Sequence, residues 1–179
     1  MTSARTLVVT DAVDLAIRRH GQETYPHECC GALVGTTDRV VDVVPLPNTT
    51  EEGPRRRFLV RASDYRLAER RAGELGAELL GFYHSHPDHP ARPSQYDLDH
   101  AWPTFAYIII SVVDGDAALP DRSAAAGQAP TRDNGARAGH MTVWYLKDDR
   151  SSFEEGSVHH GENPDSDTTA AVHRQAGHR

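Results

Sequence analysis

The sequence predicts a mixed α/β (α+β) fold in which helices flank a single mixed sheet. Short apolar or β-branched runs recur along the chain, and FAYIIISVV at 105–113 is the strongest of them. Other segments space their apolar residues three or four apart, as on one face of a helix. The two patterns are interleaved, and 179 residues suit one domain with a single core.

Each element in the first half of the chain has its own boundary signal. Thr10 or Asp11 can cap a helix that runs to about His20, where Gly21 and Pro26 follow. Ser63 or Asp64 can begin a second helix, which Gly76 ends. The predicted strands of this half are 6–10 (TLVVT), 30–34 (CGALV), 39–46 (RVVDVVPL) and the brief 58–60.

The second half begins with a buried strand at 79–83 (LLGFY) and a helix from Gln95 to about Ala101. The strand at 105–113 and another at 141–146 (MTVWYL) follow. Between them, residues 116–139 are rich in Ala, Gly, Pro and Asp, which predicts a mobile insertion. We therefore expect one domain over 1–157 and a disordered polar tail over 158–179.

Charge and composition argue against several classes of partner. The formal net charge is −7, and the only basic run, Arg55 to Arg57, lies beside Glu51 and Glu52, so no nucleic acid is expected. No apolar run is long enough to cross a bilayer, and the first residues lack the pattern of a signal peptide. Cys29 and Cys30 are adjacent and suit a reducing compartment, so a cytoplasmic protein is expected.

The stretch GFYHSHPDHPARPSQYD at 81–97 carries most of the chemistry. His84 and His86 are two apart at the end of a strand, so their side chains leave on the same side. Asp97 lies one turn into the following helix, which Ser94 opens. Two imidazoles and a carboxylate can form a three-ligand zinc site with a fourth position for water. A polar loop is the alternative, and solvent exposure is expected for His89.

The residues HSHPDHPARPSQYD fit the pattern His-x-His-Pro-x6-Ser-x-x-Asp without a gap. Upstream, ECCGALVG at 28–35 fits Glu-x-Cys-Gly-x-Leu-x-Gly. In both segments the chain resembles the JAMM (MPN+) zinc metallopeptidases, in particular their short prokaryotic members. The resemblance covers about residues 5–113 and 140–157, and implies an MPN domain with a curled mixed sheet similar to that of cytidine deaminase.

The resemblance also implies a role for each motif residue. His84, His86 and Asp97 would hold one catalytic Zn²⁺, Glu28 would be the general base, and Ser94 would help to hold the oxyanion. Other roles are open: Ser94 is a good helix N-cap, Asp97 suits the first turn of a helix, and Cys30 suits a small buried position.

The implied activity is hydrolysis of an amide bond after a C-terminal Gly-Gly tail of a ubiquitin-like or sulfur-carrier protein. Release of cysteine or another amine in sulfur or cysteine metabolism is the form we expect for a short prokaryotic member. The alternatives are a non-catalytic MPN module that binds a partner and a zinc hydrolase of a small amide. The sequence does not indicate an oligomeric state.

Overall fold

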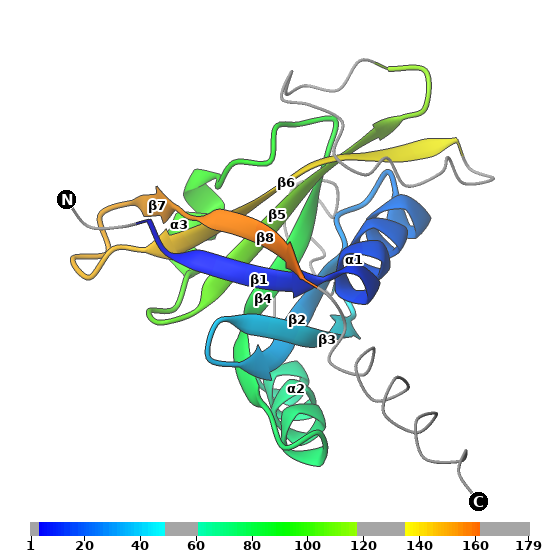
Figure 1. Ribbon diagram of the computed structural model, residues 1–179. Helices are drawn as coiled ribbons and strands as arrows, with labels where there is room; N and C mark the ends of the chain where they lie inside the picture. The colour runs from blue at the N-terminus through cyan, green and yellow to red at the C-terminus, as the bar shows by residue number, and fades with distance from the viewer. Residues whose placement is uncertain (1–3, 49–60, 118–134, 162–179) are drawn as a thin grey trace, which may run out of the picture.

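An eight-stranded mixed sheet forms the centre of the protein in Figure 1, a computed structural model that describes residues 4–48, 61–117 and 135–161. The strand order is β7-β6-β5-β4-β2-β3-β1-β8. In chain order the elements are β1 (Thr6–Thr10), α1 (Asp11–Thr24), β2 (Cys30–Thr36), β3 (Arg39–Leu46), α2 (Ala62–Glu74), β4 (Glu78–Pro87), α3 (Gln95–His100), β5 (Ala106–Asp114), β6 (Ala136–Leu146), β7 (Phe153–Glu155) and β8 (Ser157–Gly161). The predicted class of fold, a curled mixed sheet flanked by helices, is confirmed.

Most predicted elements are present, with shifted ends. Thr10 caps α1 by accepting a hydrogen bond from the Val13 amide, and α1 continues four residues beyond the predicted end at His20. The strand predicted at 79–83 is longer, because β4 extends through both histidines to Pro87. The brief strand predicted at 58–60 lies outside the described residues.

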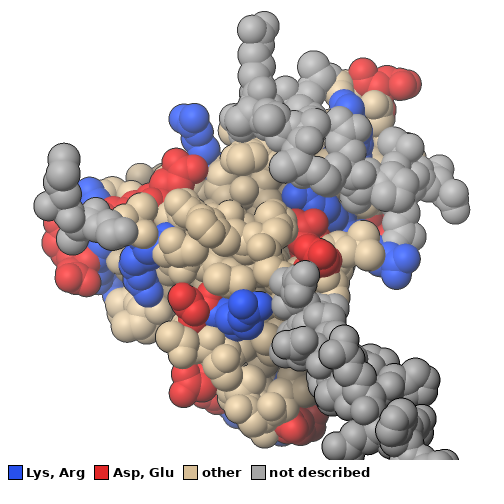
Figure 2. Space-filling model, in the orientation of Figure 1, with Lys and Arg blue, Asp and Glu red and all other residues tan. Residues whose placement is uncertain are grey.

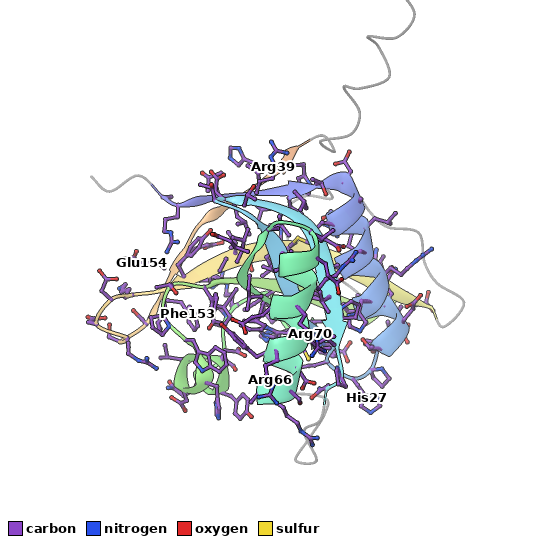
Figure 3. All side chains as sticks on the ribbon, turned by 90° about the horizontal axis from the view of Figure 1, so that it is seen from below. His27, Arg39, Arg66, Arg70, Phe153 and Glu154 are labelled. Atoms are coloured by element: carbon purple, nitrogen blue, oxygen red, sulfur yellow. The ribbon has the colours of Figure 1, made fainter. Side chains whose placement is uncertain are left out.

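The two faces of the sheet carry different helices. On one face α1 packs its Val13 and Ile17 against buried residues of β1, β4 and β5, among them Tyr83. On the other face Ala68 of α2 packs with Phe82 of β4. Figure 3 shows α2 crossing in front of the sheet, with α3 apart from it. From Gly81 onward, odd-numbered residues of β4 such as Tyr83 therefore face α1, and even-numbered ones such as Phe82 face α2 and α3.

The sheet is curled so strongly that its two edge strands lie next to each other in the sequence. Strands β7 and β8 stand at opposite ends of the strand order, yet only Gly156 separates them along the chain. The Gly156 amide bonds to the Val143 carbonyl at 2.9 Å and the Ser157 amide to the Arg5 carbonyl at 2.9 Å. A Cβ at Gly156 would lie 2.6 Å from the Arg5 carbonyl oxygen, so glycine is required at this junction.

Two predicted boundaries need correction. Residues 158–161 were expected in a disordered tail, but they form most of β8, which pairs in parallel with β1 from Thr6↔Ser157 to Thr10↔Gly161. Residues 136–139 were expected in a mobile insertion, but they begin β6. Their backbone is held by α1, because Arg18 donates to the Gly139 carbonyl and Gln22 to the Ala136 carbonyl. Residues 118–134 and 162–179 lie outside the described residues.

Surface charge, helix length and the state of the cysteines concern the partners and the compartment that the sequence predicts. On the face shown in Figure 2, Lys and Arg side chains are interspersed with Asp and Glu side chains. Across the described segments every helix falls short of the length and apolarity needed to cross a membrane. Cys29 and Cys30 are both free thiols and both buried.

Candidate metal centre and active site

His84 and His86 leave β4 on the face that carries α2 and α3. They share this face with Phe82 because side chains alternate along a strand, and Ser85 between them points to the α1 face. Both rings are buried, and His84 has only 1% of its surface exposed. Burial holds the two imidazoles in place, so this pair is not part of a solvated polar loop.

The loop that follows β4 folds back over the sheet and is fastened there. Thr142 of β6 donates its hydroxyl proton to the Ala91 carbonyl at 2.6 Å, and the Trp144 indole bonds to the Thr142 oxygen at 2.8 Å. One residue earlier, the Pro90 carbonyl lies 2.9 Å from Nδ1 of His86. A carbonyl can only accept, so Nδ1 carries the proton and Nε2 of a neutral His86 keeps its lone pair.

Asp97 reaches the histidines from the first turn of α3. The Ser94 amide and hydroxyl both donate to Oδ2 of Asp97, at 2.6 and 2.7 Å, and the Asp97 amide donates back to the Ser94 hydroxyl at 3.2 Å. These bonds form a capping box, which stabilises the start of a short helix. The N-cap role considered for Ser94 is therefore present, and it fixes the orientation of the Asp97 carboxylate.

Three potential ligand atoms converge at this point. Nε2 of His84 lies 3.0 Å from Nε2 of His86 and 3.3 Å from Oδ1 of Asp97. Nε2 of His86 lies 3.6 Å from Oδ2 of Asp97. All three residues are buried, and their ligand atoms lie within 4.8 Å of one another. The structure thus brings together the three residues that the sequence predicted as metal ligands.

The donor set and its electrostatics suit a divalent cation. Burial would raise the pKa of the Asp97 carboxyl, but the imidazoles and the Ser94 donors outweigh it and hold that pKa far below its usual range. Burial lowers the pKa of His84. Burial also acts to lower the pKa of His86, but its bonds to Asp97 and Pro90 raise that pKa overall. An ionised carboxylate between facing imidazole nitrogens favours positive charge, and a divalent cation supplies it while both rings stay neutral.

Glu28 lines the same cleft as these residues. The cleft has a volume of about 320 Å³, and Glu28, His86 and Ser94 line it together with His89, Pro90 and Arg92. Glu28 is 5% exposed and precedes β2 by two residues. Burial raises the pKa of Glu28 to about 8; the nearby His86 opposes this rise and Asp97 adds to it. A buried carboxyl poised near neutral pH is suited to accept and return a proton.

Two other residues of the motifs, His89 and Cys30, lie outside the ligand group. His89 is exposed at the rim of the cleft and is not part of the ligand group, as expected. Cys30 is fully buried, and its thiol donates to the Leu46 carbonyl at 3.6 Å. Cys30 therefore packs in the core with Leu46 and Phe82, as considered from its size, and is not part of the ligand group either.

Comparison with known proteins identifies the family. A family model that describes the prokaryotic homologues of the JAB domain matches residues 10–125, well over half of the chain. The chain belongs to this family. The JAMM resemblance seen in its sequence is confirmed, and the His84, His86 and Asp97 group is complete.

Three curated relatives are similar to this JAB domain over different shares of their own length. A desampylase of Haloferax volcanii is 34% identical over 118 residues, which cover 62% of this chain and 84% of that protein. A probable TtuB–protein conjugate cleaving protease of Thermus thermophilus is 34% identical over 92 residues, 51% of this chain and 61% of that protein. The tail tip assembly protein K of Escherichia phage N15 is 31% identical over 132 residues, 73% of this chain but only 50% of that protein.

Two solved structures support the same fold for this JAB domain. A protein of Salinibacter ruber is 34% identical with a TM-score of 0.59 and covers 89% of this chain and 94% of its own. A protein of Desulfitobacterium hafniense is 25% identical with a TM-score of 0.66 and covers 87% of this chain and 93% of its own. Both were determined in solution.

Sequence reasoning missed the residues that hold this site in shape. Thr142 and Trp144 fasten the loop from a strand more than fifty residues away, and no local pattern marks them. The Asn48 side chain donates to the Glu28 carbonyl at 3.1 Å. Ser85 bonds to the Cys29 amide at 2.8 Å. Only Ser85 had a visible signal, since a polar residue between two ligands must face the opposite side of the strand.

Proposed function

We propose that this protein is a zinc-dependent peptidase or isopeptidase that cuts the amide bond after a C-terminal Gly-Gly tail. The substrate would be a ubiquitin-like or sulfur-carrier protein joined through that tail to an amine. The observation that carries the proposal is the arrangement of one cleft: the buried carboxyl of Glu28 lines it beside His86, whose Nε2 atom meets His84 and Asp97. This arrangement supplies a metal site and a proton acceptor for the same reacting bond.

Zinc fits the donor set, because two imidazoles and one carboxylate are the ligands of many catalytic zinc sites. Bound zinc would lower the pKa of a water molecule to about 7 and polarise the scissile carbonyl. His84, His86 and Asp97 would hold the ion. Neither thiol of this chain is part of the ligand group, so a closed structural site rich in cysteine is not favoured.

Glu28 would take a proton from the attacking water and then deliver it to the leaving amine. Its raised pKa, about 8, makes both transfers accessible near neutral pH. Ser94 would have two tasks. Its hydroxyl caps α3 and orients Asp97, and its position on the cleft wall would let it turn toward the developing oxyanion.

An open strand edge supports the binding of an extended tail. Strand β3 pairs with β1 only through Arg39 and Val40, so within the described residues its stretch from Asp42 onward has one free edge. The last residue of β3, Leu46, pairs with Cys30, two residues after Glu28. A tail added along this edge would therefore run toward Glu28, held by main-chain hydrogen bonds.

The relatives point the same way. The desampylase and the TtuB–protein conjugate cleaving protease suggest a protein conjugate as substrate. We further propose, for this chain, that the released amine is cysteine or another small amine in sulfur metabolism.

The test uses a carrier protein ending in Gly-Gly that is joined to an amine, with metal content measured for each variant. We expect the wild type to bind one zinc and release the amine. Glu28→Gln should bind zinc but lose turnover, and His86→Ala should lose both. Zinc binding without hydrolysis of any conjugate would favour the non-catalytic module, and hydrolysis of small amides alone would favour the small-amide hydrolase.

A further inference from the structure

Glu28 and His86 line the same cleft, just beyond the last pair of the β2–β4 ladder. The strands are antiparallel, and Cys30 pairs with His84. One step further along both chains places Cys29 opposite Ser85, and the next step places Glu28 opposite His86. Directly opposed residues of an antiparallel pair present their side chains on the same face. The register of these two strands therefore brings Glu28 to the metal ligands.

The Cys29–Ser85 step departs from an ordinary ladder. The Ser85 amide donates to the Cys29 carbonyl at 3.1 Å, as expected. The Cys29 amide, however, donates to the hydroxyl oxygen of Ser85 at 2.8 Å. In a regular hydrogen-bonded pair that amide would bond to the main-chain carbonyl opposite it. A side-chain oxygen therefore takes the place of a carbonyl one residue before Glu28.

Ser85 lies on the α1 face, away from the cleft. A Cβ at Gly21 of α1 would lie 3.5 Å from the Ser85 Cβ, and Ser85 has no exposed surface. Ser85 therefore cannot touch a substrate in the cleft, and any effect it has on the reaction must pass through the chain at Cys29 and Glu28.

We propose that Ser85 is a positioning residue that sets the distance between Glu28 and the His84–His86–Asp97 group; this inference rests on the proposed function. If the Ser85 hydroxyl is removed, the Cys29 amide can respond in two ways. It stays buried without an acceptor, which is costly, or it shifts onto the Ser85 carbonyl and pulls β2 into a regular ladder. The cost of the first outcome favours the second, which moves Glu28 while leaving the ligands on β4 and α3 in place.

Kinetics of zinc-loaded variants test this role. For Ser85→Ala we expect kcat to fall about 10- to 100-fold, as for a misplacement of about 1 Å, with KM and zinc content unchanged. Ser85→Thr keeps the hydroxyl and should recover most of the rate. In a Glu28→Gln background, Ser85→Ala should cause no further loss, because the residue acts through Glu28. A purely structural role would instead lower zinc content or add to the effect of Glu28→Gln.

Ile110→Val is the matched control. Ile110 is fully buried on the adjacent strand β5, pairs with Ser85 and packs on the same α1 face. The loss of one carbon atom there leaves the Cys29 amide its acceptor, so kcat should be unchanged. Wild-type kcat in Ser85→Ala, or an equal loss in Ile110→Val, would overturn the proposal.

A structural measurement separates this inference from the proposed function. If the wild type hydrolyses no conjugate, the proposed function fails, but crystal structures of the zinc-loaded wild type and Ser85→Ala still decide the inference. A displaced Glu28 carboxylate beside unmoved ligands supports it. An unmoved Glu28 overturns it, whatever the activity.

Discussion

Gly31 lies directly beneath the aromatic ring of Tyr83, its partner across the β2–β4 pair. A Cβ on Gly31 would overlap the ring atoms Cε1 and Cζ. Tyr83 has no room to move away, because it is fully buried and its hydroxyl lies 2.8 Å from Nδ1 of His20 on α1. The glycine of the upstream motif is therefore explained by a ring on the neighbouring strand.

Gly31→Ala should destabilise the protein by about 2–3 kcal/mol, because overpacking a rigid core displaces side chains or backbone. Urea unfolding measures the change. Gly73→Ala is the matched control, since Gly73 lies within α2 and a Cβ there would meet nothing within 4 Å. That change should stabilise the protein by about 0.5–1 kcal/mol through helix propensity. Equal effects of the two substitutions would contradict this account of Gly31.

Removal of the Thr142 hydroxyl should weaken metal binding from a distance. Thr142 holds the Ala91 carbonyl, next to the Pro90 carbonyl that orients His86. For Thr142→Val we expect zinc affinity to fall about 10-fold or more, as for other residues that orient a metal ligand. Competition with a chromophoric chelator measures it. Thr36→Val, at the exposed end of β2, should keep wild-type affinity.

Substitution of His89 and substitution of the buried ligands should have very different effects on the zinc content of the protein. His84→Ala, His86→Ala and Asp97→Asn each remove one of three converging ligand atoms, so each should leave the purified protein nearly free of zinc. His89→Ala should keep one zinc per chain, because His89 is exposed at the rim of the cleft. Elemental analysis decides, and loss of zinc in His89→Ala would show that the ligand set is larger than three residues.

Glu28→Gln should stabilise the metal-free protein in a pH-dependent way. Burial raises the pKa of Glu28 to about 8, from an ordinary value of 4.5. Between these values the unfolded chain releases the proton and the folded chain retains it, so the stability contributed by this proton is present below pH 4.5 and is lost as pH rises through 8. Glutamine mimics the protonated form at every pH, so its advantage should reach on the order of 3 kcal/mol at pH 7.

Urea unfolding at pH 5 and pH 7.5, with a chelator present, measures this difference. Asp97→Asn should act in the opposite direction, because the pKa of Asp97 is lowered and its ionised form stabilises the fold above its unfolded pKa. A Glu28→Gln protein that is no more stable at pH 7.5 than the wild type would refute the raised pKa of Glu28.

The ligand group was predictable because its geometry is local. A spacing of two on a strand places His84 and His86 on one face, and a spacing of three on a helix places Asp97 beside Ser94. The position of Glu28 was harder. It depends on the register between two strands that lie 56 residues apart, from Glu28 to His84, and the family resemblance supplied it before the structure did.

Strand β8 and the start of β6 escaped prediction for a different reason. The residues SVHHG of β8 show no apolar alternation, because an edge strand can be held by main-chain hydrogen bonds alone. Residues 136–139 are held by polar side chains of α1, including Arg18, which also pairs with Asp14 at 2.7 Å. Ala136 and Ala138 are buried in the core, but their small side chains give no strand pattern in the sequence, so composition alone predicted an insertion there.

The pairing of β1 with β8 has a consequence for the order of folding. Thr6 pairs with Ser157, so β1 meets its outer neighbour only after some 150 further residues have been synthesised. Such a distant pairing cannot nucleate folding and must form late. During translation β1 can pair only with β3, and its other edge stays available to foreign strands until β8 emerges. A nascent chain stalled before residue 157 is therefore the form of this protein most exposed to misassembly.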